Sequence, residues 1–182
     1  MLLKRDRNGF TLVELMIIIL IVAILSIFSA PNFKKMMINF QLKSITRDLA
    51  SNFQKARLEA VKRNTNLVTI NFSPGAYNPQ GFVGSYIMFL DDGTGGGIPG
   101  DGLRNGGEFI IAQAAMPRYM SLYNTDFPGN TTGFDAMGYP TSGVGTYIVC
   151  IRNCVSRYYK ITLSPIGGIK LEMSGDGLLW IN

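Results

Sequence analysis

Residues 9–30 read GFTLVELMIIILIVAILSIFSA, and this run sets the organisation of the whole chain. The 21 residues from Phe10 to Ala30 include a single charged side chain, that of Glu14. A helix of this length rises roughly 30 Å, which matches the hydrocarbon thickness of a bilayer. We therefore predict a membrane-spanning helix over residues 10–30. Because an ionised carboxylate is costly at membrane depth, Glu14 is a candidate functional residue.

The beginning of this run also contains a processing motif. Gly9-Phe10-Thr11-Leu12-Val13-Glu14-Leu15 resembles the cleavage site of type IV pilins and of the pseudopilins of type II secretion. The resemblance implies that a prepilin peptidase removes residues 1–9 as a leader, cuts between Gly9 and Phe10, and methylates the new amine of Phe10. An ordinary secretory signal fits less well, because it has a shorter apolar core and is cut at a small-x-small site. Residues 28–30 followed by Pro31 make a poor site of that kind.

Cleavage would give Glu14 a physical role. A carboxylate in hydrocarbon is tolerated when a cation pairs with it, and the amine of Phe10 is such a cation. The two residues are four apart, so they are able to meet within one helix. The resemblance instead places the pair between neighbouring subunits, where the amine of an incoming subunit meets the acid of the previous one. We expect Glu14 to guide the helix from the bilayer into a filament.

The composition leaves room for one anchor and one modest globular domain, with 182 residues and 20.0 kDa. Three of the 17 basic residues, Lys4, Arg5 and Arg7, precede the anchor. The positive-inside rule then keeps the N-terminus in the cytoplasm and places the remainder on the periplasmic side of a bacterial inner membrane. The net charge of +5 is too mild to indicate a nucleic-acid partner.

Beyond the anchor, the sequence predicts a helical continuation over residues 31–64 and a β-rich periplasmic head over residues 65–182. Pro31 is expected to kink or locally open the helix. One apolar stripe with helical spacing follows it, formed by Ile38, Leu42, Ile45, Leu49, Phe53, Ala56 and Ala60. Runs typical of strands occupy residues 67–72, 85–90, 108–112, 145–150, 155–163 and 169–173, with a looser segment at 116–139. The predicted fold class is α+β, with a long N-terminal helix packed on a mostly antiparallel β-sheet.

The two cysteines lie at the tip of a predicted hairpin. Cys150 and Cys154 are separated by three residues, between two runs typical of strands. On the oxidising side of the membrane they favour a disulfide across the tip, which would pin the hairpin locally. A metal site is the weaker alternative, because the chain has no histidine to complete it.

A narrower resemblance covers the second half of the helix and the first strands. Ala56-Arg57-Leu58-Glu59-Ala60-Val61-Lys62-Arg63, then Phe89-Leu90-Asp91 before a glycine loop ending at Glu108, resemble the GspH/FimT group of minor pilins and pseudopilins. The resemblance implies a minor structural subunit that helps to build or cap a filament. Its expected partners are the prepilin peptidase, other major and minor pilins or pseudopilins, the inner-membrane assembly platform and membrane lipid.

The glycine-rich loop from Asp91 to Gly102 is predicted to be flexible and solvated. Calcium is the weaker alternative, and its candidate ligands are Asp91, Asp92, Asp101 and Glu108. The loop departs from the EF-hand template, since Leu103 and Ala112 occupy ligand positions when the motif is started at Asp101. No catalytic set is visible, so we expect neither an enzyme nor a required cofactor.

Two other functions stay open. One is a DNA receptor for natural transformation, because some FimT-like competence proteins, which this group resembles, carry a basic Gly-Arg-x-Arg cluster near this place. Here isoleucine stands between Gly168 and Lys170, so that cluster is largely missing and a DNA partner is not expected. A plain inner-membrane-anchored periplasmic binding protein would keep its leader and stay outside filaments. Pilus and type II secretion apparatus are not separable by these residues, since the resemblance covers both.

Overall fold

The computed structural model describes residues 10–64, 68–142, 147–153 and 157–175, without the side chains of residues 27–31, 147–150, 152 and 153. The chain divides into two compact units, Met1–Met37 and Ile38–Asn182. The predicted leader, residues 1–9, lies outside the described residues.

The long predicted helix is confirmed as α1, Leu12–Arg63, 52 residues in length. The helix ends at Arg63 because of the conformation of the next residue. Asn64 adopts a left-handed conformation, with φ of 51°, and its N–H donates to the carbonyl of Val61 at 3.1 Å. The helix is continuous through Pro31, and a kink at that residue stays a prediction.

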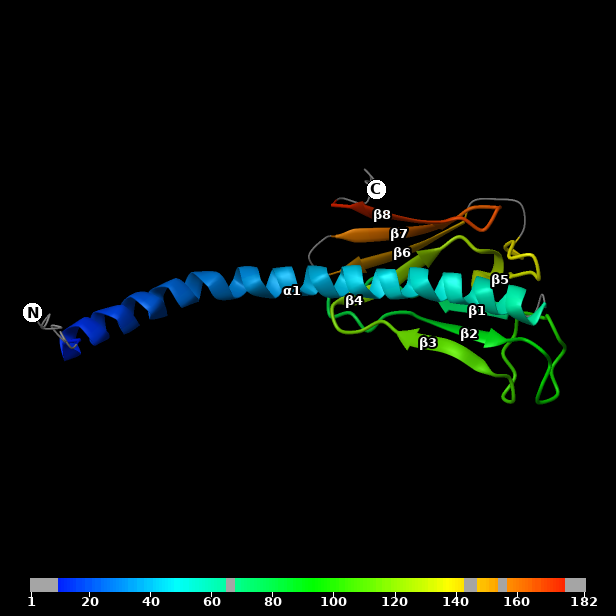
Figure 1. The fold of residues 1–182 in the computed structure, drawn as a ribbon, viewed down its shortest axis with the longest axis horizontal. Helices are drawn as coiled ribbons and strands as arrows, with labels where there is room; N and C mark the ends of the chain where they lie inside the picture. The colour runs from blue at the N-terminus through cyan, green and yellow to red at the C-terminus, as the bar shows by residue number, and fades with distance from the viewer. Residues whose placement is uncertain (1–9, 65–67, 143–146, 154–156, 176–182) are drawn as a thin grey trace, which may run out of the picture. The chain divides into compact units, whose positions relative to one another are not determined.

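The predicted apolar stripe of the second unit forms its core. Six of its members are at most 5% exposed, and Ile45 is partly buried; the six are Ile38, Leu42, Leu49, Phe53, Ala56 and Ala60. Phe53 stacks on Phe72 of β1 (Val68–Ser73), with ring centroids 5.9 Å apart. Phe72 in turn stacks on Phe127, at 5.5 Å. Figure 1 shows the second half of α1 lying across β1, the strand that carries Phe72.

The described residues form eight strands in two four-stranded sheets, and every pairing between these strands is antiparallel. The first sheet has the order β3-β2-β1-β5, with β2 at Ser85–Leu90, β3 at Ile110–Ala115 and β5 at Thr131–Phe134. The second has the order β4-β6-β7-β8, with β4 at Met120–Thr125, β6 at Tyr147–Asn153, β7 at Tyr158–Leu163 and β8 at Ile169–Ser174. A short 3-10 helix, η1, spans Pro128–Asn130. The α+β class with an antiparallel sheet is therefore confirmed.

The segment before β2 joins the two sheets. The N–H of Leu122 in β4 donates to the carbonyl of Val83 at 2.9 Å, and the Leu122 carbonyl accepts from the N–H of Gly75 at 3.1 Å. Gly84, with φ of 87°, follows directly and leads into β2. A β-carbon on Gly84 would lie 2.6 Å from the Leu122 carbonyl oxygen, so only glycine fits this junction without movement.

Two details differ from the sequence prediction. Strands β4 and β5 fall within residues 116–139, the segment predicted to be looser. Strand β3 begins at Ile110 rather than at residue 108. The cause of this second difference is Glu108, whose side chain is engaged by backbone N–H groups of the preceding loop.

Candidate functional site

The first turn of α1 is stabilised by a side-chain cap. The N–H of Glu14 donates to the hydroxyl oxygen of Thr11 at 3.2 Å, and the N–H of Leu15 donates to the Thr11 carbonyl at the same distance. Thr11 is thus the N-cap, and Glu14 is the third residue of the helix. Thr-x-x-Glu is the sequence pattern of a capping box, so this helix start has a local signal in the sequence. The side chain that caps the helix is that of Thr11, and its hydroxyl reaches Glu14 at the backbone N–H rather than at the carboxylate.

The predicted processing residues lie at the edge of the described chain. Phe10 precedes the N-cap and is 75% exposed, and Gly9 lies outside the described residues. The carboxylate of Glu14 is exposed, in the first helical turn, where a negative charge is favoured by the helix dipole. Glu14 makes no ion pair with the residues that the structure describes.

Apolar side chains cover every side of the first part of α1. From Phe10 to Leu25, the large apolar side chains are between 47% and 75% exposed. A helix that is apolar on all sides is normally covered by lipid or by other helices. Among the described residues, no helix combines the length and the apolarity that a membrane span requires.

The loop between β2 and β3 is held together by two buried carboxylates. Asp91, 0% exposed, accepts the N–H groups of Gly100 and Gly102 at 2.9 and 2.8 Å. Glu108, 3% exposed, accepts the N–H groups of Gly93 and Asn105 at 3.2 and 2.6 Å. Burial raises the pKa of Asp91, although its two backbone hydrogen bonds oppose this. Asp91 and Glu108 are therefore buried and engaged by backbone N–H groups rather than solvated, whereas residues 94–96 and 98–101 of the loop are exposed.

The four calcium candidates are not assembled into a ligand set. Asp92 and Asp101 each accept the backbone N–H two residues ahead, at 3.0 and 2.8 Å, as in Asx turns. No group of three or more His, Cys, Asp or Glu residues in the described part of the chain is placed to hold a metal ion.

The predicted hairpin that carries the cysteines is confirmed as β6 and β7, in which Cys150 is opposite Lys160. Cys154 and the side chain of Cys150 lie outside the described residues. The disulfide stays a prediction.

Two of the cations near the C-terminal strands are engaged by one acid. Glu172 accepts from Lys160 at 2.8 Å and from Lys170 at 3.0 Å. The hydrogen bond from Lys160 is the main reason that the pKa of Glu172 is lowered to about 2. Lys170, the one basic residue left of the DNA-binding cluster that this sequence largely lacks, is thus paired with an acid.

Comparisons with known proteins agree with these features. The family model described as type II transport protein GspH matches residues 46–167, and a model of the prokaryotic N-terminal methylation motif matches residues 4–30. The chain is similar to pilin-like protein PilA1 of Thermus thermophilus, with 27% identity over 170 residues, which cover 91% of this chain and 99% of that protein. No solved structure matches.

Proposed function

The chain belongs to the family of type II transport protein GspH, and we propose that it is a minor subunit of a type IV pilus or of a type II secretion pseudopilus. One observation carries the proposal. The methylation motif at residues 4–30 leads into a helix that is apolar on every side and has Glu14 in its first turn. Such a helix suits a subunit that passes from lipid into a bundle of like helices. The role is structural rather than enzymatic.

Processing by a prepilin peptidase forms the first step of this proposal. The peptidase cuts between Gly9 and Phe10, and Phe10 becomes an N-methylated first residue. The helix begins only at Leu12, so Phe10, on the C-terminal side of the bond to be cut, precedes the hydrogen-bonded turns of α1. Before assembly, residues 10–30 anchor the chain in the bacterial inner membrane, and the second unit lies in the periplasm.

Assembly forms the second step. Glu14 is the only charge between Phe10 and Ala30, so its carboxylate is the sole anionic partner in this segment for the amine of a neighbouring Phe10. Pairing of the two charges lowers the cost of placing either in an apolar bundle. The partners are other pilins or pseudopilins and the inner-membrane assembly platform.

Substitutions at Glu14 test this step. Glutamine is accepted at the third position of a capping box, so Glu14→Gln keeps the helix start and removes only the charge. We expect Glu14→Gln and Glu14→Ala each to lower incorporation into sheared filaments or isolated pseudopili about tenfold or more, since 1.4 kcal/mol of lost pairing corresponds to a factor of ten.

Thr11→Ala is the matched control, because it removes the cap and leaves the charge. Incorporation of this variant is expected to stay near the wild-type level, as judged by quantitative immunoblots of filament and membrane fractions. Wild-type incorporation of Glu14→Gln would contradict the proposed role of the charge.

A further inference from the structure

Three of the four edge strands in the two sheets are protected. The edge of β5 is covered by residues 139–142, where the N–H of Thr141 donates to the carbonyl of Gly133 at 3.0 Å. The edge of β4 is covered by the segment that contains Val83, through the bond to Leu122. Strand β8 carries the charged side chains of Lys170 and Glu172, which disfavour the approach of another strand.

The fourth edge strand, β3, pairs on its outer side with no strand or loop of the described residues. Its sequence is IIAQAA, which has no charge and no proline. The N–H of Met116 donates to the carbonyl of Gly84, and hydrogen-bonded and open residues alternate in antiparallel pairs. Ala114 and Ala112 therefore direct their N–H and C=O groups at β2, whereas those of Gln113 and Ala115 point away from it. Among the described residues, no hydrogen bond reaches the outward groups of Gln113 and Ala115.

Lys55 of α1 occupies one position on this edge. Its ammonium donates to the carbonyl of Ile111 at 3.3 Å. No carboxylate in the described part of the chain lies within ion-pair distance of Lys55; Glu59, four residues on, pairs instead with Arg63 at 3.0 Å. Lys55 is thus a cation that lies beside an open strand and is satisfied by a single carbonyl.

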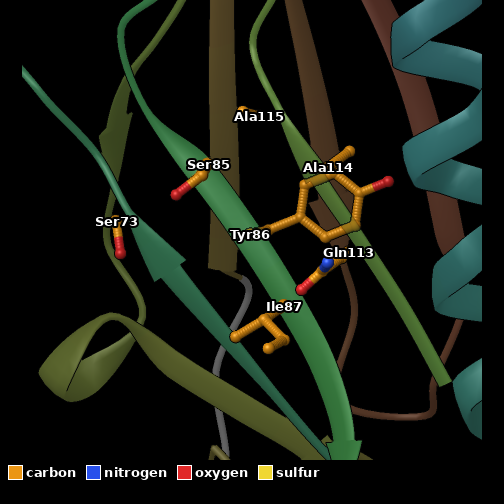
Figure 2. Close-up of a pocket in the computed structure, with 7 residues that line it drawn as sticks. All are labelled: Ser73, Ser85, Tyr86, Ile87, Gln113, Ala114 and Ala115. Carbon is orange, nitrogen blue, oxygen red and sulfur yellow. The ribbon is translucent and has the colours of Figure 1, made fainter. Parts of the chain in front are cut away.

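The face of the sheet beside this edge is hollowed. Ser85 and Ile87 of β2 point to the opposite side of the sheet from Tyr86, whose ring points toward α1 (Figure 2). Gln113 and Ala115 are opposite Ile87 and Ser85 in the register, so their side chains share that outer face. Small side chains leave a hollow of about 440 Å³ there, lined by Ser73, Ser85, Tyr86, Ile87, Gln113, Ala114 and Ala115. The space suits a large side chain of an adjacent strand.

We propose that the open edge of β3 accepts an extended segment of a neighbouring subunit as a fifth strand, and that a carboxylate on this segment pairs with Lys55. The inference rests on the proposed function, which supplies the neighbouring subunit. Outward groups of Gln113 and Ala115 bond the backbone of the added strand, as in other cases of strand addition. An N–H of that strand replaces Lys55 at the Ile111 carbonyl, and this frees the ammonium for the carboxylate.

Amide hydrogen exchange at single-residue resolution tests the added strand directly. The full chain in detergent micelles is compared with the same chain in isolated filaments or pseudopili. The amides of Gln113 and Ala115 are expected to exchange at least about tenfold more slowly in the assembly. Those of Ala112 and Ala114, already bonded to β2, serve as internal controls and are protected in both samples. Equal rates at Gln113 and Ala115 in the two samples would overturn strand addition.

Two pairs of variants test separately the backbone hydrogen bonds of the β3 edge and the charge of Lys55. Gln113→Pro removes an outward N–H without touching the bonds to β2, and Gln113→Ala keeps that N–H. Lys55→Glu reverses the charge at the edge, and Lys62→Glu makes the same change elsewhere on α1. We expect several-fold lower incorporation of Gln113→Pro and Lys55→Glu than of their controls. Equal incorporation within both pairs would contradict the proposal.

The outcomes also distinguish the two proposals. A wild-type chain that is absent from every filament and pseudopilus preparation overturns the proposed function and strand addition together. A chain that is incorporated but has unprotected Gln113 and Ala115 amides overturns strand addition alone. If Gln113→Pro fails to fold, strand addition is tested by the amide hydrogen exchange of the wild-type chain in micelles and in filaments.

Discussion

The carboxylate of Glu172 in β8 pairs with two lysines, and its pKa is lowered. The lowered pKa predicts that the stability of the protein depends on pH. The ordinary pKa of 4.5 falls to about 2, chiefly because Lys160 donates to the carboxylate. A group with a depressed pKa contributes its stability above the unfolded-state value and loses it as pH falls through the folded-state value. The contribution is therefore complete at pH 7 and is lost between about pH 4.5 and pH 2.

The substitution Glu172→Gln tests this. We expect the variant to be less stable than the wild type by roughly 1–2 kcal/mol at pH 7, because hydrogen bonds to a charged group are lost. Thermal denaturation across the pH range should show the gap closing below pH 4.5. Glu59→Gln, which removes the i,i+4 pair with Arg63 on α1, is the control and should have a much smaller effect. A gap that stays constant down to pH 2 would contradict the account.

Single residues also show what sequence alone does not decide. The acids and glycines from Asp91 to Glu108 are visible in the sequence, and they suggested solvation or calcium. Whether a carboxylate bonds a metal, water or a backbone N–H depends on burial, and burial depends on how the loop packs against strands distant in sequence. Thr11 is the opposite case, since its capping pattern with Glu14 is local and was predictable.

At the scale of the elements, we predict that a substitution at Gly84, where the two sheets meet, lowers the stability of the protein. Gly84→Ala places a β-carbon 2.6 Å from the Leu122 carbonyl oxygen and forces a positive φ on alanine. We expect a loss of about 1–3 kcal/mol from the backbone conformation alone, and more from the contact. Urea denaturation of the full chain in detergent measures this loss in the free energy of unfolding.

Gly106→Ala is the matched control for this prediction, because a β-carbon at Gly106 meets no atom within 4 Å. Its midpoint in urea should stay close to that of the wild type. Equal midpoints for the two alanine variants would mean that the junction at Gly84 is not tightly packed.

The elements were predictable where a pattern is local and repeated. The stripe from Ile38 to Ala60 has seven members at helical spacing, so it predicts both the helix and the face of the helix that is buried. Strands β4 and β5 have no such signal. Strand β4 buries Ser121 and includes Asn124, and β5 is four residues long with Gly133 at its third position. These segments are strands because β6 and β1 pair with them, and the partners lie far away in the chain. The open edge of β3 was beyond prediction for the same reason, since it depends on which strands have neighbours.

At the scale of the whole molecule, each unit has a surface that suits assembly. The first exposes apolar side chains around α1, and the second exposes the backbone of one edge strand. The apolar surface of the first unit follows directly from the composition. A run of 21 residues with one charged side chain presents apolar side chains on every side when it forms a helix. Membership of the GspH family agrees with a subunit whose surfaces are completed by neighbours.

The proposed assembly requires that a prepilin peptidase first removes residues 1–9. The most direct measurement is the mass and N-terminal sequence of the mature chain, purified from a bacterium with an active prepilin peptidase. We predict the mass of residues 10–182 plus one methyl group, with the methyl on the amine of Phe10. A mature chain that still carries residues 1–9 would contradict the account.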